Sequence, residues 1–150
     1  MKNKRFIYIF IAILLIIAAI IIIREESLEK KILPKTNSNQ TEKADLIVVD
    51  SPQPNTTVKN TFTISGRARG TWYFEAVFPI VVLDSSGKEI GNAQARATDD
   101  WMTENFVPFT AELKLTSPYS GKATLVLKKD NPSGEAERDD ALKVPIMIVL

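Results

Sequence analysis

Residues 6–23 form an uninterrupted apolar run, FIYIFIAILLIIAAIIII, directly after the basic residues Lys2, Lys4 and Arg5. As a helix with a rise of ~1.5 Å per residue, this run would extend roughly 27 Å, close to the hydrocarbon thickness of a bilayer. A helix buried in a soluble core is a poor alternative, because no side of the run is polar. Positive residues stay on the cytoplasmic side. We therefore expect residues 1–5 to be cytoplasmic, residues 6–23 to span the cell membrane once, and the remainder to be extracytoplasmic.

A cleaved signal peptide is the alternative interpretation of this segment. Signal peptides have apolar cores of about 7–15 residues and a cleavage site made of small residues. Here the run ends in Ile20 to Ile23, Arg24 follows directly, and no A-x-A pattern is present. The chain also lacks the cysteine that lipidation would require. We therefore favour a retained signal anchor.

Residues 24–45 have the composition of a linker. They include five basic and five acidic residues and a cluster of Asn, Gln, Ser and Thr from Thr36 to Thr41. Pro34 and the polar stretch after it provide no apolar face for packing. Residues 46–150 contain 11 Lys or Arg and 13 Asp or Glu, a net charge of −2. Because nucleic-acid-binding domains are typically basic, we expect no nucleic-acid partner.

Beyond Asp45 the hydrophobicity alternates with a period of two, which indicates half-buried strands. The pattern is clearest at 107–115 and 142–150, and it predicts further strands at 46–49, 62–64, 90–97 and 123–127. Residues 72–84 are apolar enough for a strand that is buried on both faces or that bends at Pro79. About seven short strands in about 100 residues favour an all-β fold, an immunoglobulin-like β-sandwich. A small barrel is the structural alternative, because strand number does not fix topology.

Four local sequences in this region resemble those of a known family. They are Ser51 to Asn55 (SPQPN), Gly70 to Ala76 (GTWYFEA), Asp100 to Thr103 (DWMT) with Phe106 to Phe109 (FVPF), and Lys129 to Gly134 (KDNPSG). Together, over roughly residues 46–150, they resemble the immunoglobulin-like domain of bacterial spore germination. The resemblance implies an extracytoplasmic β-sandwich with an interaction role in sporulation or germination proteins of the bacterial envelope.

The chain contains neither Cys nor His. Thiolate and imidazole zinc sites, Cys nucleophiles, Ser-His-Asp triads and disulfides are therefore excluded. Asp99, Asp100 and Glu104 are the carboxylates that a glycan hydrolase would use as acid and base. However, adjacent residues on a strand point to opposite faces, and pairs of loop carboxylates are common. We therefore expect no enzymatic activity and no cofactor, with a carboxylate-based hydrolase as the less favoured alternative.

Three aromatic residues, Trp72, Tyr73 and Trp101, are candidates for ligand contact. Aromatic side chains bind sugars and peptides, but they also fill cores. We favour core packing for Trp72, because immunoglobulin-like sandwiches bury a tryptophan. Trp101 lies beside Asp100 in an expected loop, where packing and ligand contact are equally good interpretations.

Glu75 lies between apolar neighbours in a segment that we expect to be a buried strand. A buried carboxylate needs a charged or hydrogen-bonding partner. We therefore expect Glu75 to pair with Arg67 or Arg69 of the preceding strand.

Residues 130–140 are rich in oxygen-bearing side chains, as calcium-binding loops are. Their match to an EF-hand loop fails, because Pro132 occupies the third position and no Glu falls at the twelfth. We therefore expect a solvated acidic loop and no metal. Asp130 and Asn131 remain candidate binding residues, and the expected partner is another envelope protein or a cell-wall glycan.

Overall fold

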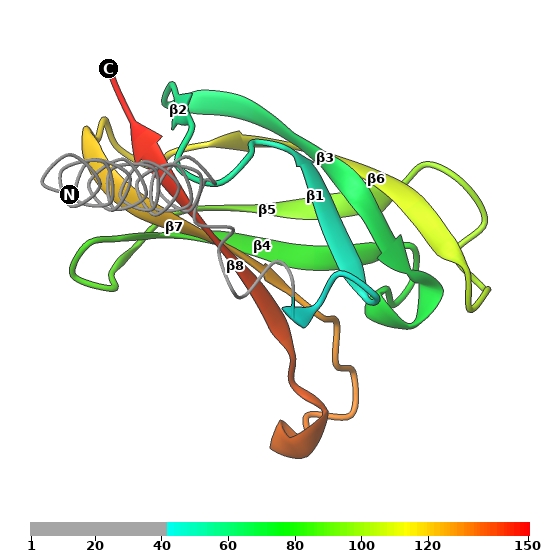
Figure 1. The fold of residues 1–150 in the computed structure, drawn as a ribbon. Helices are drawn as coiled ribbons and strands as arrows, with labels where there is room; N and C mark the ends of the chain where they lie inside the picture. Colours follow the sequence, from blue (N-terminus) through cyan, green and yellow to red (C-terminus); the bar gives the residue numbers. More distant parts are fainter. Residues whose placement is uncertain (1–41) are drawn as a thin grey trace, which may run out of the picture. The chain divides into compact units, whose positions relative to one another are not determined.

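The computed structural model describes residues 42–150 of the chain. The predicted cytoplasmic tail, the predicted membrane span and most of the predicted linker lie outside these residues. Within residues 42–150, no helix has the length and apolar composition to cross a membrane. The domain is all-β (Figure 1). Its elements are β1 (Ile47–Ser51), β2 (Thr57–Val58), β3 (Thr61–Arg69), η1 (Gly70–Trp72), β4 (Val77–Asp84), β5 (Glu89–Ala97), β6 (Phe106–Lys114), β7 (Gly121–Lys128), η2 (Ala136–Arg138) and β8 (Ala141–Ile148).

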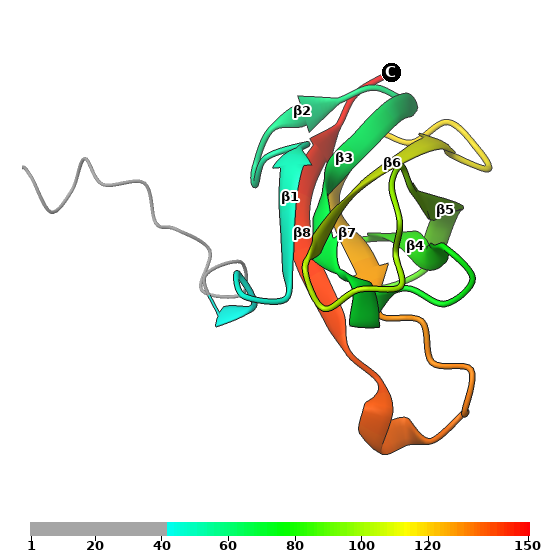
Figure 2. The ribbon, with the colours of Figure 1, turned by 90° about the vertical axis from the view of Figure 1, so that its right-hand side faces the viewer.

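The strands follow the order β1-β3-β6-β5-β4-β7-β8-β2, and the sheet curls over so that its two halves face each other (Figure 2). Strands β3 and β6 pair along their whole length, whereas β5 and β6 pair in a ladder only at Arg96–Thr110 and Ala97–Phe109. The weak β5–β6 junction is therefore the corner between a β1-β3-β6 layer and a β5-β4-β7-β8-β2 layer. Within the described chain, β1 and β2 are the two ends of the strand order, so no ladder closes the sheet into a barrel.

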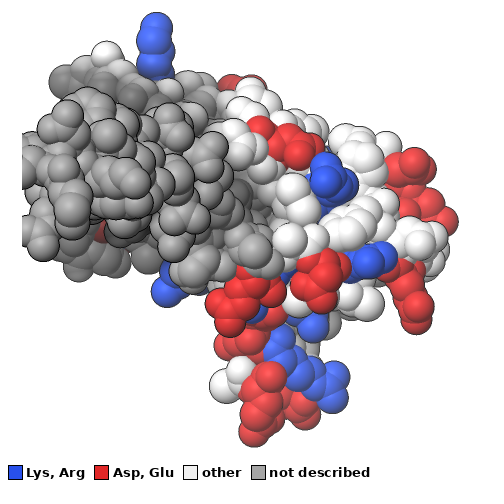
Figure 3. All heavy atoms as spheres, viewed as in Figure 1, with Lys and Arg blue, Asp and Glu red and all other residues white. Residues whose placement is uncertain are grey.

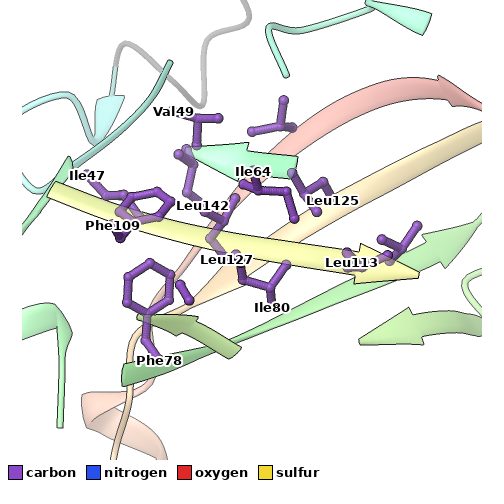
Figure 4. Close-up of a cluster of buried hydrophobic side chains, with 14 of the residues drawn as sticks. Ile47, Val49, Ile64, Phe78, Ile80, Phe109, Leu113, Leu125, Leu127 and Leu142 are labelled. Atoms are coloured by element: carbon purple, nitrogen blue, oxygen red, sulfur yellow. The ribbon is translucent and has the colours of Figure 1, made fainter. Parts of the chain in front are cut away.

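The core lies between the two layers and is entirely apolar. Figure 4 shows labelled side chains of β1, β3, β4, β6, β7 and β8 meeting there. The ring of Phe78 lies edge-on to Phe109 with centroids 5.0 Å apart, and Tyr73 lies edge-on to Phe78 at 5.2 Å. Such aromatic pairs add about 0.5–1.5 kcal/mol beyond the burial of their area. An aromatic row thus joins β4 to β6 across the sandwich.

Each of the seven predicted strands is present in some form, and the structure adds β2, which pairs in parallel with β8 through two residues. The prediction for residues 72–84 was only partly correct. Residues 70–72 are a 3₁₀ helix, a turn follows, and β4 begins at Val77. Pro79 does not bend the strand between layers. It is paired with Gln94 of β5, while the ladder with β7 begins one residue later, at Ile80.

Candidate binding surface

Three connections lie at one end of the sandwich, which we call the loop end. They are the β3–β4 connection (residues 70–76), the β5–β6 connection (98–105) and the β7–β8 connection (129–140). Two backbone hydrogen bonds join them, from Gly70 N to Asn105 O at 3.1 Å and from Asp130 N to Trp72 O at 3.0 Å. The β3–β4 connection is therefore the central member of the three.

All seven candidate residues from the sequence lie on these connections. Trp72, Tyr73 and Glu75 belong to the first, Asp100 and Trp101 to the second, and Asp130 and Asn131 to the third. The described chain also begins at this end, because Lys43 forms an ion pair with Asp140. Sequence positions up to 97 residues apart are thus brought to one end of the domain by the topology.

Gly70 packs the first connection against the second. A Cβ atom at this position would lie 1.8 Å from the carbonyl oxygen of Thr103 and 2.3 Å from that of Trp101. Any side chain would therefore push the β5–β6 connection away. The absence of a side chain at Gly70 fixes how these two connections sit together.

Trp72 and Tyr73 belong to the core and not to the exposed surface. Trp72 is 2% exposed, and its Nε1 has no hydrogen-bond partner among the described residues. The Tyr73 hydroxyl donates to Val107 O at 2.7 Å. Burial raises the pKa of the Tyr73 phenol well above its ordinary value, with a smaller opposing effect of a backbone hydrogen bond. Both buried aromatic rings therefore anchor the β3–β4 connection to the core.

The expected burial and pairing of Glu75 are wrong. Glu75 is exposed and occupies a two-residue turn in which Phe74 and Val77 exchange backbone hydrogen bonds of 3.0 and 3.1 Å. Both central residues have positive φ, 51° at Glu75 and 63° at Ala76, as in a type I′ turn. The turn reverses the chain directly after the buried Tyr73, and Glu75 therefore points to solvent and not into a strand.

The two arginines make other contacts. Arg67 pairs with Asp50 at 3.3 Å. Arg69 donates to the carbonyl oxygens of Asp45 and Glu104, at 2.9 and 3.2 Å, and its guanidinium lies 4.3 Å from the centroid of the Phe106 ring. Arg69 therefore ties the start of the described chain to the β5–β6 connection.

The carboxylates of the β5–β6 connection shape their own loop. Asp99 accepts a hydrogen bond from Asp100 N at 2.8 Å, and Asp100 accepts one from Met102 N at 3.0 Å. Trp101 is partly buried against the core, whereas Met102 is 77% exposed. The loop thus turns one apolar side chain inward and presents the next one to solvent.

Asn131 organises the β7–β8 connection, which projects from the body of the domain (Figures 1 and 2). Its Nδ2 donates to Glu135 O and to Asp139 Oδ1, both at 2.8 Å, and its Oδ1 accepts from Ser133 Oγ at 2.6 Å. Figure 3 shows acidic and basic side chains together on this projection. Within residues 42–150, no group of three acidic residues is arranged to hold a metal ion.

A shallow groove of about 220 Å³ separates the first and third connections. Its walls are formed by Thr71, Tyr73 and Phe74 on one side and by residues 129–133 with Arg138 on the other. Phe74, 42% exposed, stands on this groove. Phe74 and Met102 are the functional candidates that the sequence interpretation missed, although both directly follow a conspicuous aromatic residue that is buried or partly buried.

The domain is an immunoglobulin-like β-sandwich, and at its loop end the β3–β4 connection contacts the other two connections. Residues 46–136 match the model of one family, the immunoglobulin-like domain of bacterial spore germination. The chain belongs to this family, as the four local sequences indicated. No curated protein and no solved structure matches it.

Proposed function

We propose that this chain is a membrane-anchored, extracytoplasmic binding module of the bacterial envelope, without enzymatic activity, that engages another envelope protein through its loop end. The observation that carries the proposal is the presence of two exposed large apolar side chains, Phe74 and Met102, on connections that Gly70 packs together. A role in sporulation or germination is the expectation that the family brings.

The loop end has the features of a pre-organised protein interface. Buried bonds fix the backbone beneath Phe74, so little conformational entropy would be lost when a partner binds. Exposed apolar anchors surrounded by polar residues are the usual pattern of interface hot spots. Glu75, Asp99 and Asp100 are exposed around these anchors. Such charges contribute more to association rate and partner choice than to affinity.

The hydrogen bonds of the acidic residues also favour binding over hydrolysis. Asp99 and Asp100 accept hydrogen bonds from backbone N–H groups of their own loop and so set its conformation. The hollow that they line with Phe106 to Pro108 measures about 270 Å³ and is open to solvent. Glycan cleavage instead needs two carboxyl groups that face the scissile bond from either side.

Membrane anchoring is supported by the sequence of residues 6–23 and by the basic residues before it. Protease added to protoplasts should digest the β-sandwich while the N-terminal tail remains protected. Protection of the sandwich from external protease would overturn the proposed topology.

The binding proposal is tested by photo-crosslinking of the full-length protein in envelope membranes. The variant F74A/M102A should lose its crosslinked protein partner. The matched control V149A/L150A removes two exposed apolar side chains from the end of the chain, away from the loop end, and should keep it. Equal crosslinking by both variants would overturn the proposal, as would co-sedimentation with insoluble cell-wall glycan that depends on Phe74 and Met102.

A further inference from the structure

The outer face of the β5-β4-β7-β8 layer, which points away from the core, carries an apolar row. Ile80 and Val82 of β4 are core residues, so the alternating residues of this strand point outward. This outward row is Val77, Pro79, Val81 and Leu83. It continues onto β7, where Val81 is paired with Val126. An antiparallel sheet normally alternates apolar inward with polar outward residues, and β4 departs from that rule along its whole length.

The outward row of the opposite layer provides the comparison within the same molecule. Strand β3 has Ile64 and Ala68 in the core. The positions that alternate with these and point outward are Thr61, Thr63, Ser65, Arg67 and Arg69, all polar. The apolar outer row is therefore a property of one layer and does not follow from the fold.

Basic residues border this apolar row, and the valines at its centre are recessed below the surface. Val81 and Val126 are 8% and 4% exposed although neither belongs to the core cluster. The register places one exposed carboxylate on the outward face, Glu89 opposite Leu83. It places four exposed cations on the same face, two of them on β7: Arg96, Lys122, Lys128 and Lys143. None of the four forms a salt bridge with a described carboxylate. Because residues 46–150 carry a net charge of −2, this face concentrates positive charge on an otherwise acidic domain.

Two hollows lie along the face. One, of about 410 Å³, is lined by Lys122, Thr124, Pro145 and Met147, among others. The other, of about 590 Å³, is lined by Pro79, Lys128 and Ala141 and by the β7–β8 connection, which contributes Lys129, Asn131 and three aspartates, Asp130, Asp139 and Asp140. Apolar atoms contribute to both, and each contains one of the bordering lysines. The first hollow therefore offers a place for the side chains of an acidic ligand, whereas the aspartates of the second would repel carboxylates.

We propose that this face, which we call the basic groove, binds an extended acidic polypeptide segment that carries apolar side chains. The unpaired cations are complementary to carboxylates, which raises the association rate and selects against basic partners. The apolar floor favours a polypeptide over a simple polyanion, since a phosphate polymer gains nothing from valine, proline and leucine. The recessed floor disfavours a bilayer surface, because membrane-binding faces present their apolar side chains outward to the acyl region.

The proposal does not depend on Phe74 or Met102, the two anchors proposed for the loop end. Its test is a selection of displayed random dodecapeptides on the full-length protein in nanodiscs of uncharged lipid. The enriched peptides should be net acidic and contain apolar residues, and higher ionic strength should weaken their binding. Affinity should fall at least tenfold in the triple variant K122E/K128E/K143E. The matched control K59E/K88E/K114E reverses three exposed lysines elsewhere and should bind within twofold of the wild type.

Three outcomes would overturn the proposal. The first is enrichment of peptides without an acidic bias, or of peptides that bind the triple variant as well as they bind the wild type. The second is self-association of the wild-type protein in sedimentation that the triple variant abolishes, because the face would then be an interface between copies. The third is displacement of the peptides by anionic lipid vesicles together with equally tight vesicle binding. Tryptophan fluorescence of both triple variants shows whether they are folded, and F74A/M102A should bind the selected peptides normally.

Discussion

The hydroxyl of Tyr73 donates a 2.7 Å hydrogen bond to the carbonyl oxygen of Val107. This bond joins the segment after β3 to the first residues of β6, and both partners are buried. The exposed Phe74 is the next residue in the chain. A core interaction therefore determines where the proposed contact residue stands on the surface.

Replacing Tyr73 by phenylalanine should lower the free energy of unfolding by about 1–3 kcal/mol, because the carbonyl of Val107 would remain buried without its partner. Denaturant unfolding of the full-length protein in detergent, followed by tryptophan fluorescence, measures this change. Tyr119→Phe is the matched control, since the Tyr119 hydroxyl makes a similar bond of 2.9 Å to Lys122 O at an exposed position. Equal losses in the two variants would contradict the assigned role of Tyr73.

The buried phenol of Tyr73 should make the free energy of unfolding depend on pH. Burial raises the pKa of Tyr73 above its ordinary value of 10.0. A raised pKa in the folded state means that this contribution to stability is complete below about pH 10 and is lost as the pH rises further. The stability difference between the wild type and Y73F should therefore shrink as the pH rises from about 10 to about 12. A difference that is constant over this range would contradict the prediction.

Most of the strands could be predicted, because apolar and polar residues alternate in any strand that has one buried face and one solvent-exposed face. In β6, Val107, Phe109 and Leu113 are buried, as the pattern indicated. The alternating residues Pro108, Thr110, Glu112 and Lys114 are exposed. Strand β2 could not be found in this way, because two residues are too few to show a period. Its pairing with β8 depends on residues about 90 positions later in the sequence.

The strand predicted for residues 72–84 was wrong at 72–76, because an apolar run does not distinguish a strand from a tight reversal between two buried segments. Trp72 and Tyr73 are adjacent and both buried, which a strand with one wet face does not permit. The reversal at Glu75 and Ala76 requires positive φ at both residues, and neither residue type indicates it. The loop positions of Asp100 and Trp101, in contrast, followed from local composition.

Gly70→Ala should lower the free energy of unfolding by more than about 2 kcal/mol, because the new methyl group would overlap backbone atoms of Thr103 and Trp101. These atoms are not the ends of flexible side chains and cannot move without shifting the whole connection. Gly87→Ala is the control. It has positive φ but open space around it, so only the backbone cost of about 1 kcal/mol is expected. Calorimetry of both variants would show whether G70A is the more damaging substitution.

Asn131→Ala should loosen the β7–β8 connection without unfolding the domain. The substitution removes two donated hydrogen bonds of 2.8 Å that close the loop, and local opening then requires less free energy than global unfolding. Trypsin should therefore cut after Lys129 or Arg138 several times faster, while the melting temperature changes little. Asn92→Ala, which removes one exposed bond to Glu89, should leave these cleavage rates unchanged. Unchanged cleavage in N131A would contradict the role of Asn131.

Substitutions in the turn at Glu75 and Ala76 should stabilise the domain, in contrast to the variants above. Two residues with side chains hold φ of 51° and 63°, a conformation that costs roughly 1 kcal/mol or more for each L-residue. Asn-Gly is the preferred pair for such a turn. The double variant E75N/A76G should therefore raise the free energy of unfolding by about 1–2 kcal/mol in the same denaturant assay.

The double variant also separates stability from binding at the loop end. Phe74 keeps its side chain and its backbone bonds to Val77, so a partner that recognises this ring should still be crosslinked. Strained backbone is concentrated at functional sites, where it is retained despite its cost. A more stable variant that has lost its partner would show that Glu75 itself contacts the partner. A less stable variant would show that the turn is not strained and would contradict the prediction.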